Sequence, residues 1–139
     1  MTTQEYPSTG ETNLQVLLKS MEPVLNTGKY VFCRQEKERL FSVENVLFFF
    51  KESEANTLVM RKEQADLEGY TYEGIFAWIS LTVHSSLEAT GLTAAFSTAL
   101  AKHGISCNVV AAYYHDHIFV PTQDAEKAME VLKGFQKIN

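Results

Sequence analysis

The most constraining feature of the chain is the order of elements that its hydrophobic pattern predicts from residue 73 onward. In residues 75–83 every odd position is apolar, which is typical of a strand with one face buried along its length. A helix ending at Gly104, two strands at 105–113 and 118–120, and a last helix capped by Thr122 follow. Strand, helix, strand, strand, helix is most of a split β-α-β sandwich, so the pattern predicts an α+β, ferredoxin-like fold.

The final strand of a complete sandwich is missing, because the last predicted helix runs to the end of the sequence. The short strand predicted at 30–33 is a candidate to complete the sheet from the N-terminal half. That half also contains a helix capped by Thr12 or Asn13, strands at 46–51 and 57–61, and one or two helical turns ended by Gly69. A helix across residues 43–50 fits the periodicity as well. We expect two units, 1–69 and 70–139, packed as one body.

Composition excludes several classes of function. The chain carries 17 acidic and 12 basic residues, a formal charge of −5, and no basic cluster, so neither nucleic acid nor an anionic membrane surface is an expected partner. Its N-terminus lacks the features of a signal peptide, and no apolar run could span a bilayer. Cys33 and Cys107 are isolated and predicted to be reduced, buried thiols. A cytoplasmic location is the expectation.

Two segments resemble an ACT domain. Residues 81–95 (LTVHSSLEATGLTAA) are similar to its first strand, ligand loop and first helix, and residues 104–121 (GISCNVVAAYYHDHIFVP) to its second and third strands. Nearly the whole chain resembles short bacterial proteins with two ACT-like units in tandem, the N-terminal one rudimentary. That unit is marked by an acidic turn before a strand, here 52–54 leading into 57–59. A more distant similarity is to the paired ACT domains of arginine sensors.

The resemblance implies regulatory binding of an amino acid or related small ligand beside the loop that follows the 75–83 strand. Backbone N–H groups at a helix start would receive a carboxylate, hydroxyl groups would add hydrogen bonds, and an acidic side chain would receive an ammonium or guanidinium group. ACT units usually pair, so a homo-oligomer is also implied. The expected ligand-binding residues are Ser85, Ser86, Thr90, Gly91, Leu92, Asn108 and Asp116.

Other readings stay open. His115 and His117, two apart on a strand, with His84 nearby, would make a metal site, although the cysteines lack zinc-finger spacing. The partly apolar face of the 75–83 strand, with Phe76 and Trp78, would suit a ligand-free module that associates with itself. No nucleophile elbow, phosphate loop or dinucleotide fingerprint occurs, so we expect no catalysis and no cofactor.

Overall fold

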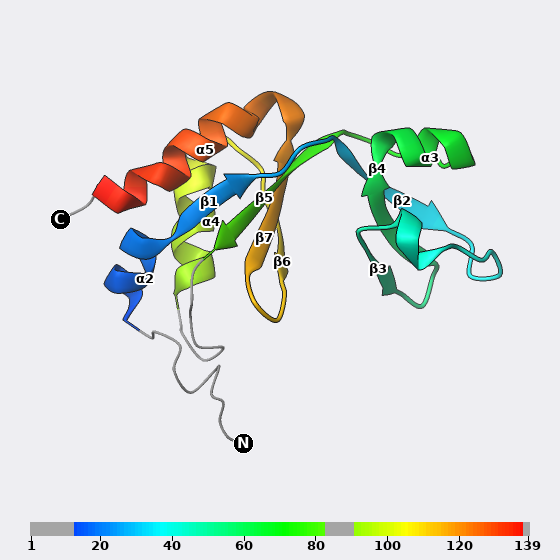
Figure 1. Ribbon diagram of the computed structural model, residues 1–139, viewed down its shortest axis with the longest axis horizontal. Coiled ribbons are helices and arrows are strands. Elements are labelled where there is room, and N and C mark those ends of the chain that lie inside the picture. Colours follow the sequence, from blue (N-terminus) through cyan, green and yellow to red (C-terminus); the bar gives the residue numbers. More distant parts are fainter. Residues whose placement is uncertain (1–12, 83–90, 138–139) are drawn as a thin grey trace, which may run out of the picture.

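The computed structural model describes residues 13–82 and 91–137, which build one curled antiparallel sheet with helices on its outer faces (Figure 1). Six strands form a continuous path in the order β3-β4-β2-β5-β7-β6, and β1 pairs beside β5. The strands are β1 (Glu22–Leu25), β2 (Tyr30–Gln35), β3 (Phe48–Lys51), β4 (Asn56–Arg61), β5 (Phe76–Thr82), β6 (Asn108–Ala111) and β7 (Asp116–Pro121). The helices are α2 (Leu14–Ser20), α3 (Lys62–Glu68), α4 (Leu92–Lys102) and α5 (Ala125–Lys133), with 3-10 turns at Val43–Asn45, Thr122–Asp124 and Gly134–Lys137.

The C-terminal unit is a four-stranded sheet in the order β1-β5-β7-β6. β5 and β6 both run antiparallel to β7, so the predicted parallel direction of the two strands joined by a helix is confirmed, as is the antiparallel hairpin. The missing edge strand is β1, whose residues 22–25 pair with 79–82 of β5. The prediction that residues 30–33 complete this sheet is therefore wrong, since β2 meets β5 only where Tyr30 lies opposite Phe76.

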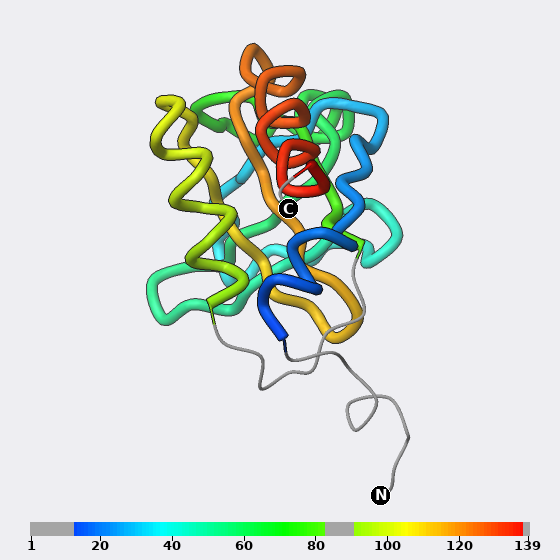
Figure 2. Tube along the Cα trace, turned by 90° about the vertical axis from the view of Figure 1, so that its left-hand side faces the viewer, coloured from blue at the N-terminus to red at the C-terminus, as the bar shows by residue number. Residues whose placement is uncertain are grey.

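Helices α2, α4 and α5 cover one face of this sheet (Figure 2). The apolar side chains of β5 and β7 on that face are buried together with one side of each helix, so a single core joins residues distant in sequence. Its fully buried members include Leu17, Ile79, Leu81, Phe96, Leu100, Ile118, Val120 and Leu132. Burial of a side chain of this kind contributes about 1.5–3 kcal/mol, which makes this core the main source of stability of the unit.

The N-terminal half is a smaller sheet, β3-β4-β2, with α3 across one face. α3 ends as predicted at Gly69, which adopts φ +77°. In place of a full helix, residues 43–45 form one 3-10 turn, and the strand follows it at 48–51, so the strand reading of this segment is confirmed. The division at residue 69 stays a prediction, although the ladder between β1 and β5 crosses it.

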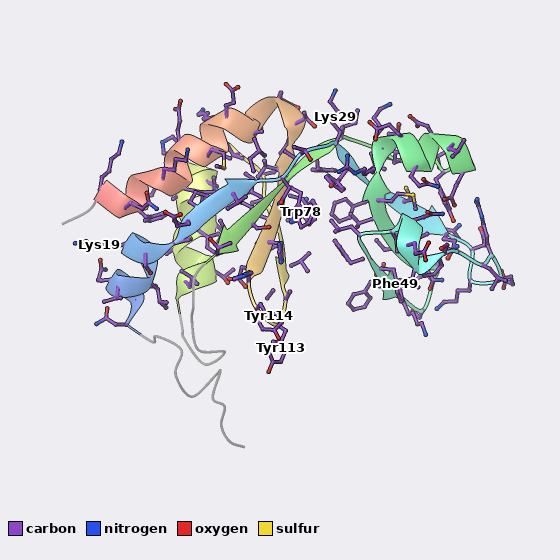
Figure 3. All side chains as sticks on the ribbon, viewed as in Figure 1. Lys19, Lys29, Phe49, Trp78, Tyr113 and Tyr114 are labelled. Atoms are coloured by element: carbon purple, nitrogen blue, oxygen red, sulfur yellow. The ribbon has the colours of Figure 1, made fainter. Side chains whose placement is uncertain are left out.

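An aromatic cluster joins the two halves on the sheet face opposite the helices. Phe119 is its centre and is 1% exposed. The centroid of its ring lies 5.5 Å from the ring centroid of Phe32, 5.8 Å from that of Phe48, 6.4 Å from that of Tyr30 and 6.5 Å from that of Trp78. Figure 3 shows Trp78 at this junction. The chain's own N-terminal half thus covers much of the partly apolar face predicted on β5.

α2 ends at Ser20, and Pro23 lies inside β1, because an edge strand tolerates a missing N–H. Two local predictions are wrong. β6 begins at Asn108, not 105, since the N–H of Ile105 bonds to Leu100 O at the end of α4. Thr122 does not cap α5; its hydroxyl donates to Ile75 O at 2.9 Å. No helix in the described part of the chain is long and apolar enough to cross a membrane.

Candidate functional site

The predicted site lies where β5 leaves the sheet and α4 begins. β5 ends at Thr82, and α4 starts at Leu92, which is buried in the helix-side core. The start of α4, the end of β5 and the β6–β7 hairpin lie toward the same end of the unit (Figure 1). Ser85, Ser86 and Thr90, together with His84, lie outside the described residues.

Gly91 shapes this end of α4. It adopts φ +89° and ψ −12°, a left-handed conformation that favours glycine. A Cβ atom at this position would lie 3.2 Å from Leu14 Cδ2, so the residue also allows α2 to approach. No side chain among the described residues caps the helix, and the first N–H groups of a helix lack partners within the helix itself. Both the backbone conformation and the close approach of α2 therefore favour glycine at this position, and the ligand-binding role of Gly91 stays a prediction.

Asp116 opens β7 at the same end of the sheet. It lies opposite Leu81 on one side and Ala111 on the other. Directly opposed residues share a face, so its carboxylate is on the helix-covered face. Burial raises the pKa of Asp116, while His117 and His115 act in the opposite direction. The two ion pairs in the described part of the chain do not involve it. A partly desolvated carboxylate that forms no ion pair with a described residue is a suitable receptor for a ligand cation.

Asn108 is separated from the other predicted residues. It lies opposite Phe119, on the face that carries the aromatic cluster, and its side chain is exposed. Among the described site residues the structure thus brings Gly91, Leu92 and Asp116 to one end and face of the unit and leaves Asn108 on the other face.

The histidines do not form a metal centre with described residues. The ring centroids of His115 and His117 lie 6.5 Å apart. His117 Nδ1 accepts a hydrogen bond from Trp78 Nε1 at 3.0 Å and lies 3.0 Å from Ser80 Oγ. Within residues 13–82 and 91–137, no three His, Cys, Asp or Glu side chains gather as metal ligands.

The two thiols are not activated as nucleophiles. Burial raises the pKa of Cys33 to about 11, with Glu68 and Asp66 adding to the effect. Burial alone raises the pKa of Cys107 to about 11. Because the thiolate is the reactive form, both cysteines are protonated at neutral pH and suited to packing.

A cavity of about 160 Å³ opens on the face opposite the helices, beside the aromatic cluster. The N-terminal half contributes two of the residues that line the cavity, and the C-terminal sheet contributes the others. The lining residues are Leu47, Phe48, Trp78, Val110, Ala112, His117 and Phe119. The even-numbered positions of β5 indicated partial burial of this face, but no pattern in the sequence placed Leu47 and Phe48 opposite them.

Family models match both halves of the chain. One model of the ACT domain matches residues 9–77, and a second matches residues 75–134. A comparison with curated proteins finds no match.

Several solved structures are similar to this chain. A Vibrio cholerae protein of unknown function, described as a possible transport protein, is 45% identical over 90% of this chain and 97% of its own, with a TM-score of 0.78. An Agobacterium tumefaciens protein is 16% identical over 84% of this chain and 89% of its own, with a TM-score of 0.70. The regulatory subunit of aspartate kinase from Thermus thermophilus is 11% identical over 84% of this chain and 97% of its own, with a TM-score of 0.60. The last two similarities concern the fold alone.

Proposed function

We propose that this chain, which belongs to the ACT-domain family and carries two such units in tandem, is a non-catalytic regulatory protein that binds an amino acid or a related small ligand. The proposed site is the end of the C-terminal unit where β5 passes into α4. The observation that carries the proposal is the joint presence there of a helix start at Gly91 that no described side chain caps and a partly buried carboxylate at Asp116 that forms no ion pair within residues 13–82 and 91–137.

These two features match the two charges of an amino acid. The uncapped N–H groups and the helix dipole favour the ligand carboxylate, which contributes about 0.3–1 kcal/mol at an exposed helix end. Asp116 would receive the ammonium group or a cationic side chain, and a charge-assisted hydrogen bond of this kind contributes about 1.5–3 kcal/mol. Micromolar affinity needs about 8 kcal/mol, so the loop hydroxyl groups of Ser85, Ser86 and Thr90 belong to the proposal as further contacts.

A thermal-shift screen against the twenty amino acids tests the proposal. A ligand at 100 times its dissociation constant adds about 2.7 kcal/mol to stability, which raises the melting temperature by roughly ten degrees for a chain of this size. Asp116→Asn should abolish that rise for the active amino acid. Asp124→Asn is the matched control, because Asp124 lies at the start of α5 and caps no N–H with its side chain. A flat response to all twenty amino acids would refute the proposal.

Self-association through the edge of the N-terminal sheet is the second candidate, with or without a ligand. β3 is the last strand of the path, and Phe50 on it is 65% exposed. An exposed apolar edge strand offers free N–H and C=O groups to a second chain. Light scattering should then give a molar mass of at least twice 15.7 kDa, and Phe50→Lys should reduce it to that of one chain. A single-chain mass for the unmodified protein at all concentrations would exclude this candidate.

A further inference from the structure

From the geometry of the cavity between the two halves we propose a second ligand site, for a small neutral molecule with an apolar ring or branched body and one hydrogen-bond acceptor. This site lies on the sheet face opposite the helices, whereas Asp116 and the start of α4 lie on the helix-covered side. It is therefore independent of the amino-acid site proposed above.

The residues that line the cavity favour a ligand whose main part is apolar. Trp78, Phe48 and Phe119 supply aromatic surfaces, and Leu47, Val110 and Ala112 supply aliphatic ones. Pockets that bind small molecules are lined mainly by such side chains, with few polar groups that fix the orientation of the ligand. A volume of about 160 Å³ is close to that of an engineered apolar cavity of about 150 Å³ that binds benzene in another protein, so one ring with a short substituent fits.

His117 supplies the polar group of the cavity. The indole N–H of Trp78 is only a donor, so His117 Nδ1, 3.0 Å away, must accept. The hydroxyl of Ser80 lies 3.0 Å from the same nitrogen and itself accepts from Asn26 Nδ2 at 3.0 Å. Burial lowers the pKa of His117, which agrees with a neutral ring. The remaining ring proton is therefore on Nε2, where it can donate to an oxygen of the ligand.

The charges around the cavity exclude an ionic ligand. No Lys, Arg, Asp or Glu side chain is among the lining residues that the structure describes, and His117 is neutral when it accepts from Trp78. Transfer of a carboxylate or ammonium group into such surroundings carries a large desolvation cost without compensation. A ketone, amide or ether oxygen costs much less to desolvate, and the His117 N–H offsets that cost.

Occupancy of the cavity would affect how the halves are joined. Leu47 and Phe48 come from the N-terminal half, while the other lining residues come from the C-terminal sheet. A ligand held between them adds contacts to the junction that the aromatic cluster forms. Binding there would stabilise the present arrangement of the two halves relative to any more open one.

Acetophenone and ethylbenzene are suitable probes because they share one carbon skeleton and differ in a single acceptor oxygen. Trp78 is the only tryptophan of the chain, so its indole N–H gives one resonance in a ¹H–¹⁵N spectrum that reports on the cavity wall. We expect a saturable shift of this resonance with acetophenone and roughly two- to tenfold weaker binding of ethylbenzene, the ratio expected for one hydrogen bond.

Variants separate the apolar and polar parts of the site. Val110→Phe fills the cavity and should abolish binding of both probes, with Ala112→Leu as a second filling variant if the first fails to fold. Val16→Phe is the matched control on the exposed side of α2 and should bind as the unmodified protein does. His117→Leu should bind both probes equally. Asp124→Asn, at the start of α5, should leave acetophenone binding unchanged.

No saturable shift with acetophenone, or equal affinity for the two probes in the unmodified protein, would overturn the proposal. Unchanged binding by folded Val110→Phe and Ala112→Leu variants would do the same. The amino-acid screen and this titration use different probes and different residues, so either proposal can fail without the other.

Discussion

Truncation of Phe119 to alanine should destabilise the whole chain, because this ring lies at the centre of the contact between the two halves. The side chain is 1% exposed and has four aromatic neighbours with ring centroids between 5.5 and 6.5 Å. Loss of a buried phenylalanine costs about 3–5 kcal/mol, including the cavity that it leaves. The free energy of unfolding of a typical domain is about 5–15 kcal/mol, so Phe119→Ala should still fold but with a small remaining stability.

Urea denaturation followed by Trp78 fluorescence and by far-ultraviolet circular dichroism measures this loss. The two signals should give the same midpoint, because the shared cluster makes the halves unfold together. Tyr114→Ala is the control: this aromatic lies at the tip of the β6–β7 hairpin (Figure 3), is 65% exposed, and should cost less than about 1 kcal/mol. Phe119→Leu, with a smaller loss, serves if the alanine variant does not fold. Equal costs at the two positions, or separate midpoints for the two signals, would refute the reasoning.

Three further changes have definite expected outcomes. The lowered pKa of His117 means that the unfolded chain takes up a proton at higher pH than the folded one, so the free energy of unfolding should fall as pH drops from about 7 to about 5. Denaturation at both pH values should show a smaller fall in the free energy of unfolding for His117→Gln than for the unmodified protein. His103→Gln, which replaces an exposed histidine, should show the same fall as the unmodified protein. Gly91→Ala should cost about 1–2 kcal/mol in urea denaturation, since its φ of +89° strains any other residue; no loss would contradict the assigned conformation. Gln35→Leu should cost about 1–3 kcal/mol by the same assay, because buried Gln35 Nε2 donates to Tyr70 Oη at 3.1 Å; a neutral effect would show that this bond is unimportant.

The strand, helix, strand, strand, helix order of the C-terminal unit could be predicted because each element carries its own periodic pattern. The alternation along β5 places Ala77, Ile79 and Leu81 on one face, and all three are buried there. Gly69 and Gly104 mark helix ends for a local reason, since both adopt positive φ.

What could not be predicted depends on partners distant in sequence. β1 has four residues, includes Pro23, and has an exposed side, so nothing local distinguishes it from a turn. Its ladder with β5 becomes visible only when the two segments are placed side by side. The same limit applies to the cavity, whose lining residues come from positions 47–48 and from a sheet some thirty or more residues later. The resemblance to the ACT domain places Asn108 in the ligand site, and only its register opposite Phe119 shows which face it occupies.

The position of β1 has a consequence for synthesis of the chain. Asn26, just after β1, bonds to Ser80, which follows it by 54 residues. At a translation rate of roughly 5–20 residues per second, β5 is synthesised about 3–10 s after β1, so β1 is unpaired during that time. During that time residues 30–68 can already close their own small sheet with α3. In sequence, the N-terminal half is thus inserted between the first strand of the C-terminal unit and the rest, and we expect a ribosome-stalling series to show protection of β2–β4 before β1.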